Sequence, residues 1–246
     1  AKLADVVFPS TCFAEKNGTF TNTERRVQKI RKALTAPGEA RDDTLTIMEL
    51  SKRLGYIMKY NHPEEIFNEI RIAWPSIAGI TYSRLERGGI QWPCTTEEHP
   101  GTPYLFKGSF PRGKALFSVV KYRPSIEEPD NEYPFILTTG RILLQYHTRT
   151  MTRRVRAIET RSGEPFVEIN PVDAEGLDIE DEDIVKITSR RGSVKLKAKI
   201  TERIEKGLLF MPFHFKEAAA NILTNSMALD PLCKIPELKV SAVRIE

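Results

Sequence analysis

The stretch Thr138–Arg161 gathers residue types that bind phosphate groups. It reads TTGRILLQYHTRTMTRRVRAIETR and contains a glycine, several hydroxyls and six arginines. Backbone amides after Thr139 and Gly140 can approach an anion closely, and the Arg141 guanidinium can donate two parallel hydrogen bonds to one. Further directional donors follow in the same stretch: Gln145, His147 and Thr148. The pattern predicts an anion cradle, with a solvated basic loop as the alternative.

The sequence lacks the motifs of a self-contained active site. Its four histidines, which never pair at the i, i+3 or i+4 spacing of a helical metal site, are His62, His99, His147 and His214. No nucleophile elbow, Walker loop or GxGxxG motif occurs either. We therefore expect no catalytic residue and no metal ligand in this chain, although a triad built from distant residues stays open.

Composition and cysteine use bound the class of protein. With 246 residues, 40% hydrophobic and 28% charged, the chain has the balance of a soluble globular protein. A net charge of +4 is too small to predict nucleic-acid binding, and no run approaches the ~20 apolar residues of a membrane helix. Cys12, Cys94 and Cys233 lie far apart in no CxxC spacing, which disfavours disulfides, a zinc site or a cluster and favours reduced thiols in the cytoplasm. The opening AKLADVVFPS, without an initiator Met or a signal segment, predicts a chain entered in mid-domain.

The first third of the chain is predicted to be mixed α/β. A strand is expected at Ala4–Phe8. An anionic cap at Asp42–Asp43 begins a helix that ends at Gly55, where a left-handed residue can stop it. A second helix begins at Pro63 and ends before Pro75.

The rest of the chain changes character twice. Residues 76–130 are rich in Pro and Gly without regular periodicity, which predicts a connecting excursion, and the acidic stretch Pro124–Pro134 is the best candidate for a linker. From Tyr133 onward the pattern becomes β-rich. We expect a hairpin that turns at Arg191–Gly192, together with short strands at Pro134–Thr139, Phe166–Ile169, Ile184–Thr188, Val194–Thr201 and Leu208–Met211. A compact β-barrel is the natural closure.

Several segments resemble the molybdopterin-dinucleotide oxidoreductases, and the formate dehydrogenase catalytic subunits in particular. The stretch that begins at Thr138 resembles the opening of the family's carboxy-terminal domain. The other similar segments are EKNGTFTNTERRVQ at Glu15–Gln28, IQWPC at Ile90–Cys94, MPFHFKEAAANILTN at Met211–Asn225 and KIPELKVSAVRIE at Lys234–Glu246. Together they are distributed over almost the whole chain, in the family's order.

The resemblance implies a fold and a cofactor. Residues 1–75 would be the end of the family's α/β domain, residues 76–132 an irregular connection and linker, and residues 133–246 a double-psi-like β-barrel that binds the molybdopterin dinucleotide. Both lobes would hold bis-molybdopterin guanine dinucleotide with Mo or W, whose protein ligand lies outside this chain.

Position by position, the resemblance also implies a set of cofactor-binding residues. They are Asp43, Thr139, Gly140, Arg141, Gln145, His147, Thr148, Phe213, Asn221 and Lys239. Asp43 would accept two N–H groups of guanine, or only cap a helix. Phe213 would wall the pterin, or be a core aromatic. Asn221, in the helix-like stretch Ala218–Leu223, would be a buried amide bonded to the pterin, or a cap or core amide. Lys239, on a strand-like run, would contact a phosphate or a pterin carbonyl, or be an exposed strand lysine.

The function implied by the resemblance is that of a cofactor-binding portion of a molybdenum- or tungsten-dependent formate dehydrogenase, which oxidises formate to CO2 or runs the reverse reaction. The metal-ligating Cys or selenocysteine and a [4Fe-4S] cluster would come from the remainder of the catalytic subunit or from a partner chain. This chain alone would be inactive. Electron-transfer subunits with Fe-S clusters or flavin would carry the electrons onward.

Two alternatives stay open at this point. In the first alternative, the chain is a non-catalytic molybdopterin-binding or assembly subunit of a split enzyme, such as formylmethanofuran dehydrogenase. In the second, it is a basic β-barrel that binds nucleic acid through Arg149–Arg161. Because that cluster lacks aromatic residues interleaved on a strand, no nucleic-acid partner is expected.

Overall fold

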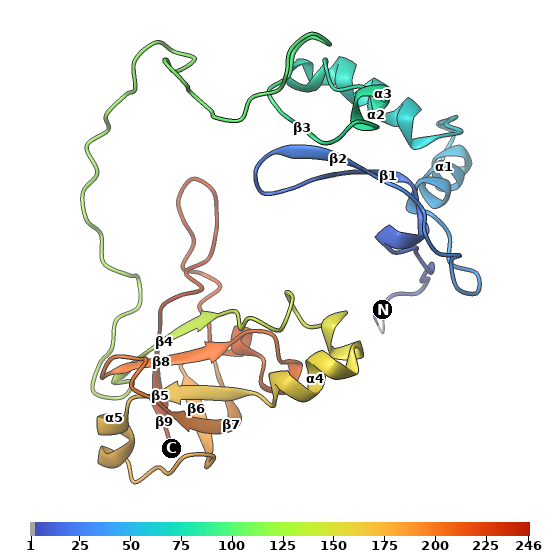
Figure 1. Cartoon of the computed structure of the whole chain (residues 1–246). Helices are drawn as coiled ribbons and strands as arrows, with labels where there is room; N and C mark the ends of the chain where they lie inside the picture. The colour runs from blue at the N-terminus through green and yellow to red at the C-terminus, as the bar shows by residue number, and fades with distance from the viewer. Residues whose placement is uncertain (1–2) are drawn as a thin grey trace. The chain divides into compact units, whose positions relative to one another are not determined.

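The computed structural model describes residues 3–246. The chain divides into two compact units, Ala1–Ser118 and Val119–Glu246, and each has a hydrophobic core of its own (Figure 1). The domain borders expected at residues 75 and 132 stay predictions.

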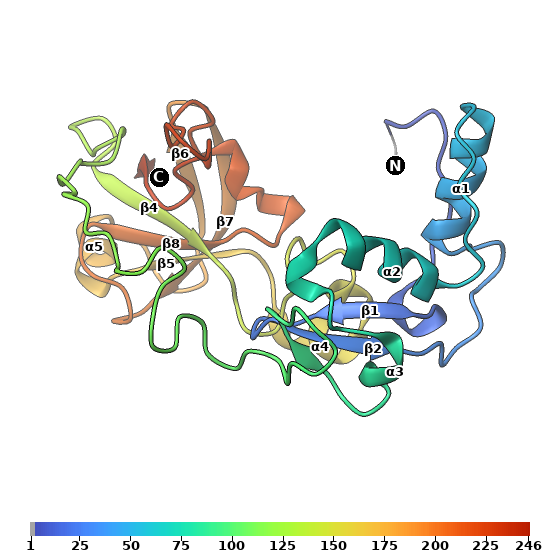
Figure 2. The ribbon, with the colours of Figure 1, turned by 90° about the horizontal axis from the view of Figure 1, so that it is seen from above.

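The first unit packs helices on a small antiparallel sheet of order β1-β2-β3. Its elements are η1 (Phe13–Glu15), β1 (Gly18–Thr21), β2 (Arg26–Ile30), α1 (Asp43–Arg53), α2 (Pro63–Ala73), η2 (Pro75–Ile77), α3 (Tyr82–Leu85) and β3 (Ile90–Gln91). Helix α2 lies along the hairpin β1–β2 (Figure 2). The core forms where Val27 of β2 and Phe67 of α2 meet the buried side chains of Ile80 and Tyr82.

Both predicted helices of this unit are confirmed. The Asp42 carboxylate accepts a hydrogen bond from the Thr44 amide at 2.9 Å, and Gly55 adopts a φ of 87°, beyond the last turn of α1. Pro63 occupies the first turn of α2, where its missing N–H leaves no helix bond unmade. Local capping chemistry therefore sets the bounds of α1 and α2.

The strand expected at Ala4–Phe8 is wrong. These residues are irregular, and Val6 and Phe8 are each 68% exposed. The nearest backbone pairing is a single parallel bridge between Ser10 and Arg41. An apolar run becomes a strand only when a neighbouring strand accepts and donates its hydrogen bonds, and in the described part of the chain none lies beside it.

The second unit is a closed, six-stranded mixed β-barrel of order β4-β8-β5-β7-β6-β9. Its elements are β4 (Phe135–Gly140), η3 (Thr152–Arg154), α4 (Arg156–Ser162), β5 (Phe166–Ile169), α5 (Pro171–Gly176), β6 (Ile184–Ser189), β7 (Gly192–Ile200), β8 (Leu208–Pro212), η4 (Lys216–Ala218), η5 (Ala220–Ile222) and β9 (Ser241–Ile245). Two pairs, β4 with β8 and β5 with β7, are parallel, and the other pairs are antiparallel. The predicted order of an α/β segment followed by a β-barrel is confirmed.

The hairpin expected from the period-two pattern is formed by β6 and β7. Val194, Leu196 and Ala198 are buried, whereas Lys195 between them is exposed. The turn comprises Arg190–Arg191, one residue earlier than expected, because Gly192 already pairs with Ser189 in the ladder.

The stretch expected to be a linker is anchored to the barrel by Glu127. This carboxylate is only 7% exposed and accepts hydrogen bonds from Arg191 at 2.6 and 3.0 Å. Arg190 donates at 3.1 Å and the Ala242 amide at 2.9 Å. The buried charge is thereby matched, and the chain before β4 is held against the hairpin turn and β9.

None of the helices in residues 3–246 is long and apolar enough to cross a membrane.

Candidate functional site

The parallel pair β4 and β8 positions the candidate site. Thr139 pairs with Met211 and Gly140 with Pro212, so the carboxyl ends of the two strands lie at one edge of the barrel (Figure 1). The Phe213 amide donates to the Gly140 carbonyl at 3.1 Å just beyond the last pair. The predicted cradle and the Met211–Asn225 signature, which are far apart in the sequence, are therefore joined at this edge.

Gly140 packs closely against Phe210 at the end of β4, so a side chain at this position would require the Phe210 ring to shift. A Cβ atom at this position would lie 2.5 Å from the ring edge of Phe210, which real Cβ atoms do not tolerate. The glycine lets β4 and β8 reach their ends together before the chain enters the loop.

Arg141, the first residue of the loop, is exposed and available to a ligand. Its guanidinium lies 5.9 Å from the centre of the Phe213 ring, in a cation–π arrangement. Among residues 3–246 its guanidinium has no hydrogen-bond or ion-pair partner. A half-buried aromatic ring and five free donors are thus brought together at the barrel edge.

Lys239 and Thr139 are also brought together here. The Lys239 ammonium donates to the Thr139 carbonyl, and the Thr139 hydroxyl donates to the Leu238 carbonyl at 2.6 Å. Lys239 is exposed and lies in the turn before β9, which begins at Ser241. The expectation of a strand lysine is therefore wrong, and the ammonium keeps donors free beside the end of β4.

Gln145 is buried at 5% exposure, and its amide is bonded within the protein. Its Nε2 donates to the Ser162 hydroxyl at 2.5 Å, and its Oε1 accepts from the Thr152 hydroxyl. These contacts brace the loop against η3 and α4. The side chain does not point its amide to solvent as a free donor.

Replacing Gln145 with leucine should lower the free energy of unfolding by about 1.5 kcal/mol, because the change removes the hydrogen bonds between the buried Gln145 amide and the Ser162 and Thr152 hydroxyls. Urea denaturation followed by circular dichroism measures the effect. Replacing the exposed Asn221 amide with leucine is the matched control, and it should change the free energy of unfolding by less than about 0.5 kcal/mol. Equal effects at both positions would contradict the bracing role.

The tip of the loop exposes His147 and Thr148. His147 has a φ of 46°, an uncommon conformation for a residue other than glycine, and the Thr148 hydroxyl lies 2.9 Å from that of Thr150. Both predicted donors are therefore exposed on the same loop as Arg141.

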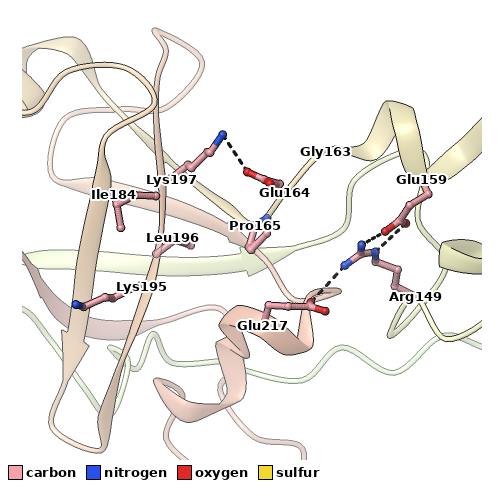
Figure 3. A pocket seen from close by; sticks show the side chains of 10 residues that line it. All are labelled: Arg149, Glu159, Gly163, Glu164, Pro165, Ile184, Lys195, Leu196, Lys197 and Glu217. Atoms are coloured by element: carbon pink, nitrogen blue, oxygen red, sulfur yellow. Dashed lines mark hydrogen bonds and ion pairs between the residues drawn. The ribbon is translucent and has the colours of Figure 1, made fainter.

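Arg149 is a residue that sequence reasoning counted only as part of a basic cluster. It is 9% exposed and has a φ of 62°. Its guanidinium forms an ion pair with Glu159 and a second one, at 3.4 Å, with Glu217 (Figure 3). The guanidinium carbon lies 4.6 Å from the centre of the Phe215 ring. The hydrogen bonds from Arg149 lower the pKa of Glu159 below its ordinary range. Nothing in the sequence indicates the pairing with Glu217, because it depends on the barrel.

A small cavity of about 300 Å³ lies beside the loop tip. The exposed cationic residues Arg153, Arg154 and Lys216 line it with Thr148 and Thr150, and so do Arg149, His214 and the acidic Glu217. Within residues 3–246 those three cations form no ion pair. Glu217 is paired with Arg149, so the three unpaired cations leave the lining with a net positive charge, which suits an anion such as a phosphate group.

His214 is a second residue that sequence reasoning did not place in the site. It is 2% exposed, and its ring contacts the loop backbone at Ile142 and His147. The one signal in the sequence was a lone histidine inside the apolar run MPFHF.

The local setting of Asn221 differs from the one expected, whereas its contact with the cofactor stays a prediction. It is exposed on η5, a 3-10 turn, so the expectation of a buried amide in a helix-like stretch is wrong. The apolar neighbours Ala220 and Leu223 supply the buried side of this turn instead.

Asp43 lies in the first unit and has partners there. Its carboxylate accepts from Lys16 at 2.8 Å and from the Ser10 hydroxyl, and these bonds lower its pKa. The helix cap is Asp42, so the alternative role of Asp43 as the cap is wrong.

No group of three or more His, Cys, Asp or Glu side chains that could hold a metal ion occurs among residues 3–246.

Comparison with known proteins places these features in a family. Residues 1–53 match the family model "Molybdopterin oxidoreductase", and residues 135–242, which include the barrel and its loop, match "Molydopterin dinucleotide binding domain".

Curated relatives align over the full length of the chain. It is 58% identical to the F420-dependent formate dehydrogenase subunit alpha of Methanocaldococcus jannaschii, covering 37% of that protein. It is 43% identical to the assimilatory nitrate reductase catalytic subunit of Bacillus subtilis and 38% identical to formate dehydrogenase H of Escherichia coli, covering 36% and 35% of them. The chain thus spans little more than a third of the length of these relatives.

The fold also has a solved counterpart. Acetylene hydratase from Pelobacter acetylenicus superposes with a TM-score of 0.69 at 19% identity, over 99% of this chain and 38% of that one. At this identity the match concerns the fold alone. The two family models and the alignments over the full length of this chain show that the chain belongs to the molybdopterin oxidoreductase family.

Proposed function

We propose that this chain supplies the dinucleotide-binding part of a molybdenum- or tungsten-dependent formate dehydrogenase. The observation that carries the proposal is the loop after β4, where the Arg141 guanidinium has no hydrogen-bond or ion-pair partner within the described residues and three further cations line a cavity of about 300 Å³. Relatives at 58% and 50% identity are named as F420-dependent formate dehydrogenase alpha subunits, which supports formate as the substrate.

The residues present fit bis-molybdopterin guanine dinucleotide, a cofactor with phosphate groups, polar pterin edges and flat rings. Arg141 and Lys239 would neutralise phosphates, and Phe213 would wall a ring with its exposed face. His147 and Thr148, both exposed, would add donors at the loop tip. The backbone of Thr139 and Gly140 would bring the loop amides close to the anion.

Three other residues have more specific proposed roles. Gln145 would hold the loop in shape through its internal hydrogen bonds, and exposed Asn221 would reach a pterin edge from η5. The Asp43 carboxylate already accepts a hydrogen bond from Lys16. It would bind guanine while keeping this hydrogen bond.

When bound, the cofactor supplies a metal centre suited to the two-electron oxidation of formate to CO2. The residues of this chain contribute orientation and charge neutralisation, since they bring cations and hydrogen-bond donors to one edge of the barrel. The metal-ligating side chain and a [4Fe-4S] cluster would come from the rest of the catalytic subunit or from a partner chain. The names of the relatives support F420 as the electron acceptor. We propose that a partner subunit with Fe-S clusters or flavin passes the electrons to it in the cytoplasm.

The test is an assay of the native protein that contains this sequence, purified without oxygen and analysed for molybdenum and tungsten. We expect formate-dependent reduction of F420 by the assembled protein. Nitrate-dependent oxidation of a reduced viologen without formate oxidation would contradict the proposal and favour the activity of the 43% identical relative. A stable 28 kDa subunit that binds the cofactor but has neither activity would favour a split, non-catalytic subunit.

A further inference from the structure

We propose that His214 is a positioning residue, which holds the Ile142–His147 loop in its anion-receiving shape as the neutral tautomer protonated on Nδ1. This inference deepens the proposed function and rests on it for the identity of the ligand. His214 follows β8, whereas the loop follows β4, so the histidine joins the two strand ends through side-chain contacts as well as backbone pairing.

The ring contacts the loop backbone at two points, Ile142 near the end of β4 and His147 at the loop tip. The Ile142 amide donates to His214 Nε2 at 3.0 Å, and His214 Nδ1 contacts the His147 carbonyl oxygen. Only one assignment satisfies both contacts, since Nε2 must carry a lone pair and Nδ1 must carry the proton. In the opposite tautomer, the Nε2–H group would face the Ile142 N–H group. The lone pair of Nδ1 would face the His147 carbonyl oxygen.

Burial makes these two bonds difficult to replace. The side chain is 2% exposed, and its ring packs against Phe213 with the ring centres 4.6 Å apart. Solvent therefore has little access to the Nε2 and Nδ1 atoms.

The loop needs external support because its backbone is strained. His147 and Arg149 have φ values of 46° and 62°, which L residues rarely adopt. Arg149 is held by Glu159 and Glu217, while His147 is held through its carbonyl by His214. His214 also lines the small basic cavity, so the shape of the loop and the shape of the cavity depend on the same ring.

Three substitutions in the full chain separate the two bonds. His214→Gln can place an amide oxygen near Nε2 and keep the bond from Ile142, whereas His214→Asn can place an amide N–H near Nδ1 and keep the bond to His147. His214→Phe keeps a ring but loses both bonds. Val167→Ala, which removes buried volume from the barrel core at β5, is the control for loss of stability alone.

The probe is GDP, which carries the guanine and phosphate groups of the proposed cofactor. We expect His214→Phe to weaken GDP binding about tenfold in calorimetric titration, with the Gln and Asn variants in between and Val167→Ala at the wild-type value. Hydrogen exchange of the Ile142 amide should accelerate in the Phe and Asn variants but not in the Gln variant. The ¹⁵N spectrum of wild-type His214 should show the proton on Nδ1.

Two results would overturn the role of His214: a wild-type proton on Nε2, or GDP binding by folded His214→Phe equal to that of wild type. Should the Phe variant fail to fold, unchanged Ile142 exchange in the Asn variant would overturn it as well. Absence of GDP binding by the wild-type chain would instead contradict the proposed function, because the tautomer and exchange results do not depend on the ligand.

Discussion

Replacing Glu127 with alanine is expected to lower the free energy of unfolding of the barrel by about 3 kcal/mol, because the change removes a buried carboxylate that accepts charge-assisted hydrogen bonds from Arg190 and Arg191. The amide of Ala242 in β9 loses its acceptor in the same variant. Urea denaturation of the full chain, followed by circular dichroism and NMR signals of the barrel, measures the loss.

The chain offers two internal controls for this measurement. Glu128→Ala removes an adjacent, exposed carboxylate and should change stability by less than about 0.5 kcal/mol. Both tryptophans, Trp74 and Trp92, lie in the first unit, so their fluorescence reports its unfolding and not that of the barrel. Equal stability of the Glu127 and Glu128 variants would show that the contact at Glu127 does not stabilise the barrel.

The Glu127 contribution should also depend on pH. Burial raises the pKa of this carboxyl, but the hydrogen bonds from Arg191 and the Ala242 amide outweigh it, so the pKa lies below its ordinary value of 4.5. A carboxyl with a lowered folded-state pKa contributes its full stability above the unfolded pKa and loses it as the pH falls through the folded pKa. The stability difference between wild type and Glu127→Gln should therefore be constant down to about pH 4.5 and shrink below it. A difference that grows in acid would contradict this assignment.

Replacing Arg141 with alanine is expected to weaken GDP binding about thirtyfold, equivalent to about 2 kcal/mol, through the loss of charge-assisted hydrogen bonds to phosphate. Stability should hardly change, since the exposed guanidinium contacts only the Phe213 ring among the described residues. Calorimetric titration at a fixed salt concentration measures the affinity.

The matched control for Arg141 is Lys195→Ala. It removes the same single positive charge from the exposed face of β7, and within residues 3–246 Lys195 has no ion-pair partner. We expect its GDP affinity to stay within about twofold of wild type. Arg141→Lys should retain part of the affinity, because an ammonium keeps the charge but loses the paired donors. An equal loss in the Lys195 and Arg141 variants would indicate general electrostatic attraction instead of a specific contact.

Local patterns predicted much of the fold. The capping residues of α1 and α2, the alternation Val194, Leu196, Ala198 in β7 and the short apolar runs of β4, β5 and β8 each act over a few residues. The resemblance to the molybdopterin oxidoreductases, carried by several such segments, is confirmed by the family models and the relatives. The ten expected cofactor contacts have not been tested and stay predictions.

The wrong predictions, and the residues that the sequence did not indicate, depend on contacts between distant parts of the chain. Ala4–Phe8 has the composition of a strand but no partner in the described chain, and Asn221 lies on the outer side of a turn that the sequence favoured as helix-like. His214, Arg149 and Glu127 meet their partners only after the barrel closes.

Residue spacing was therefore sufficient to predict helices, a hairpin and a candidate anion-binding loop in this chain. The support of that loop by His214 and the attachment of the segment before β4 by Glu127 could be found only in the folded barrel. The reason is physical: propensity and capping act between neighbours in sequence, whereas burial and hydrogen bonding select partners by distance in space, and His214 and Ile142 become neighbours only through the pairing of β4 with β8.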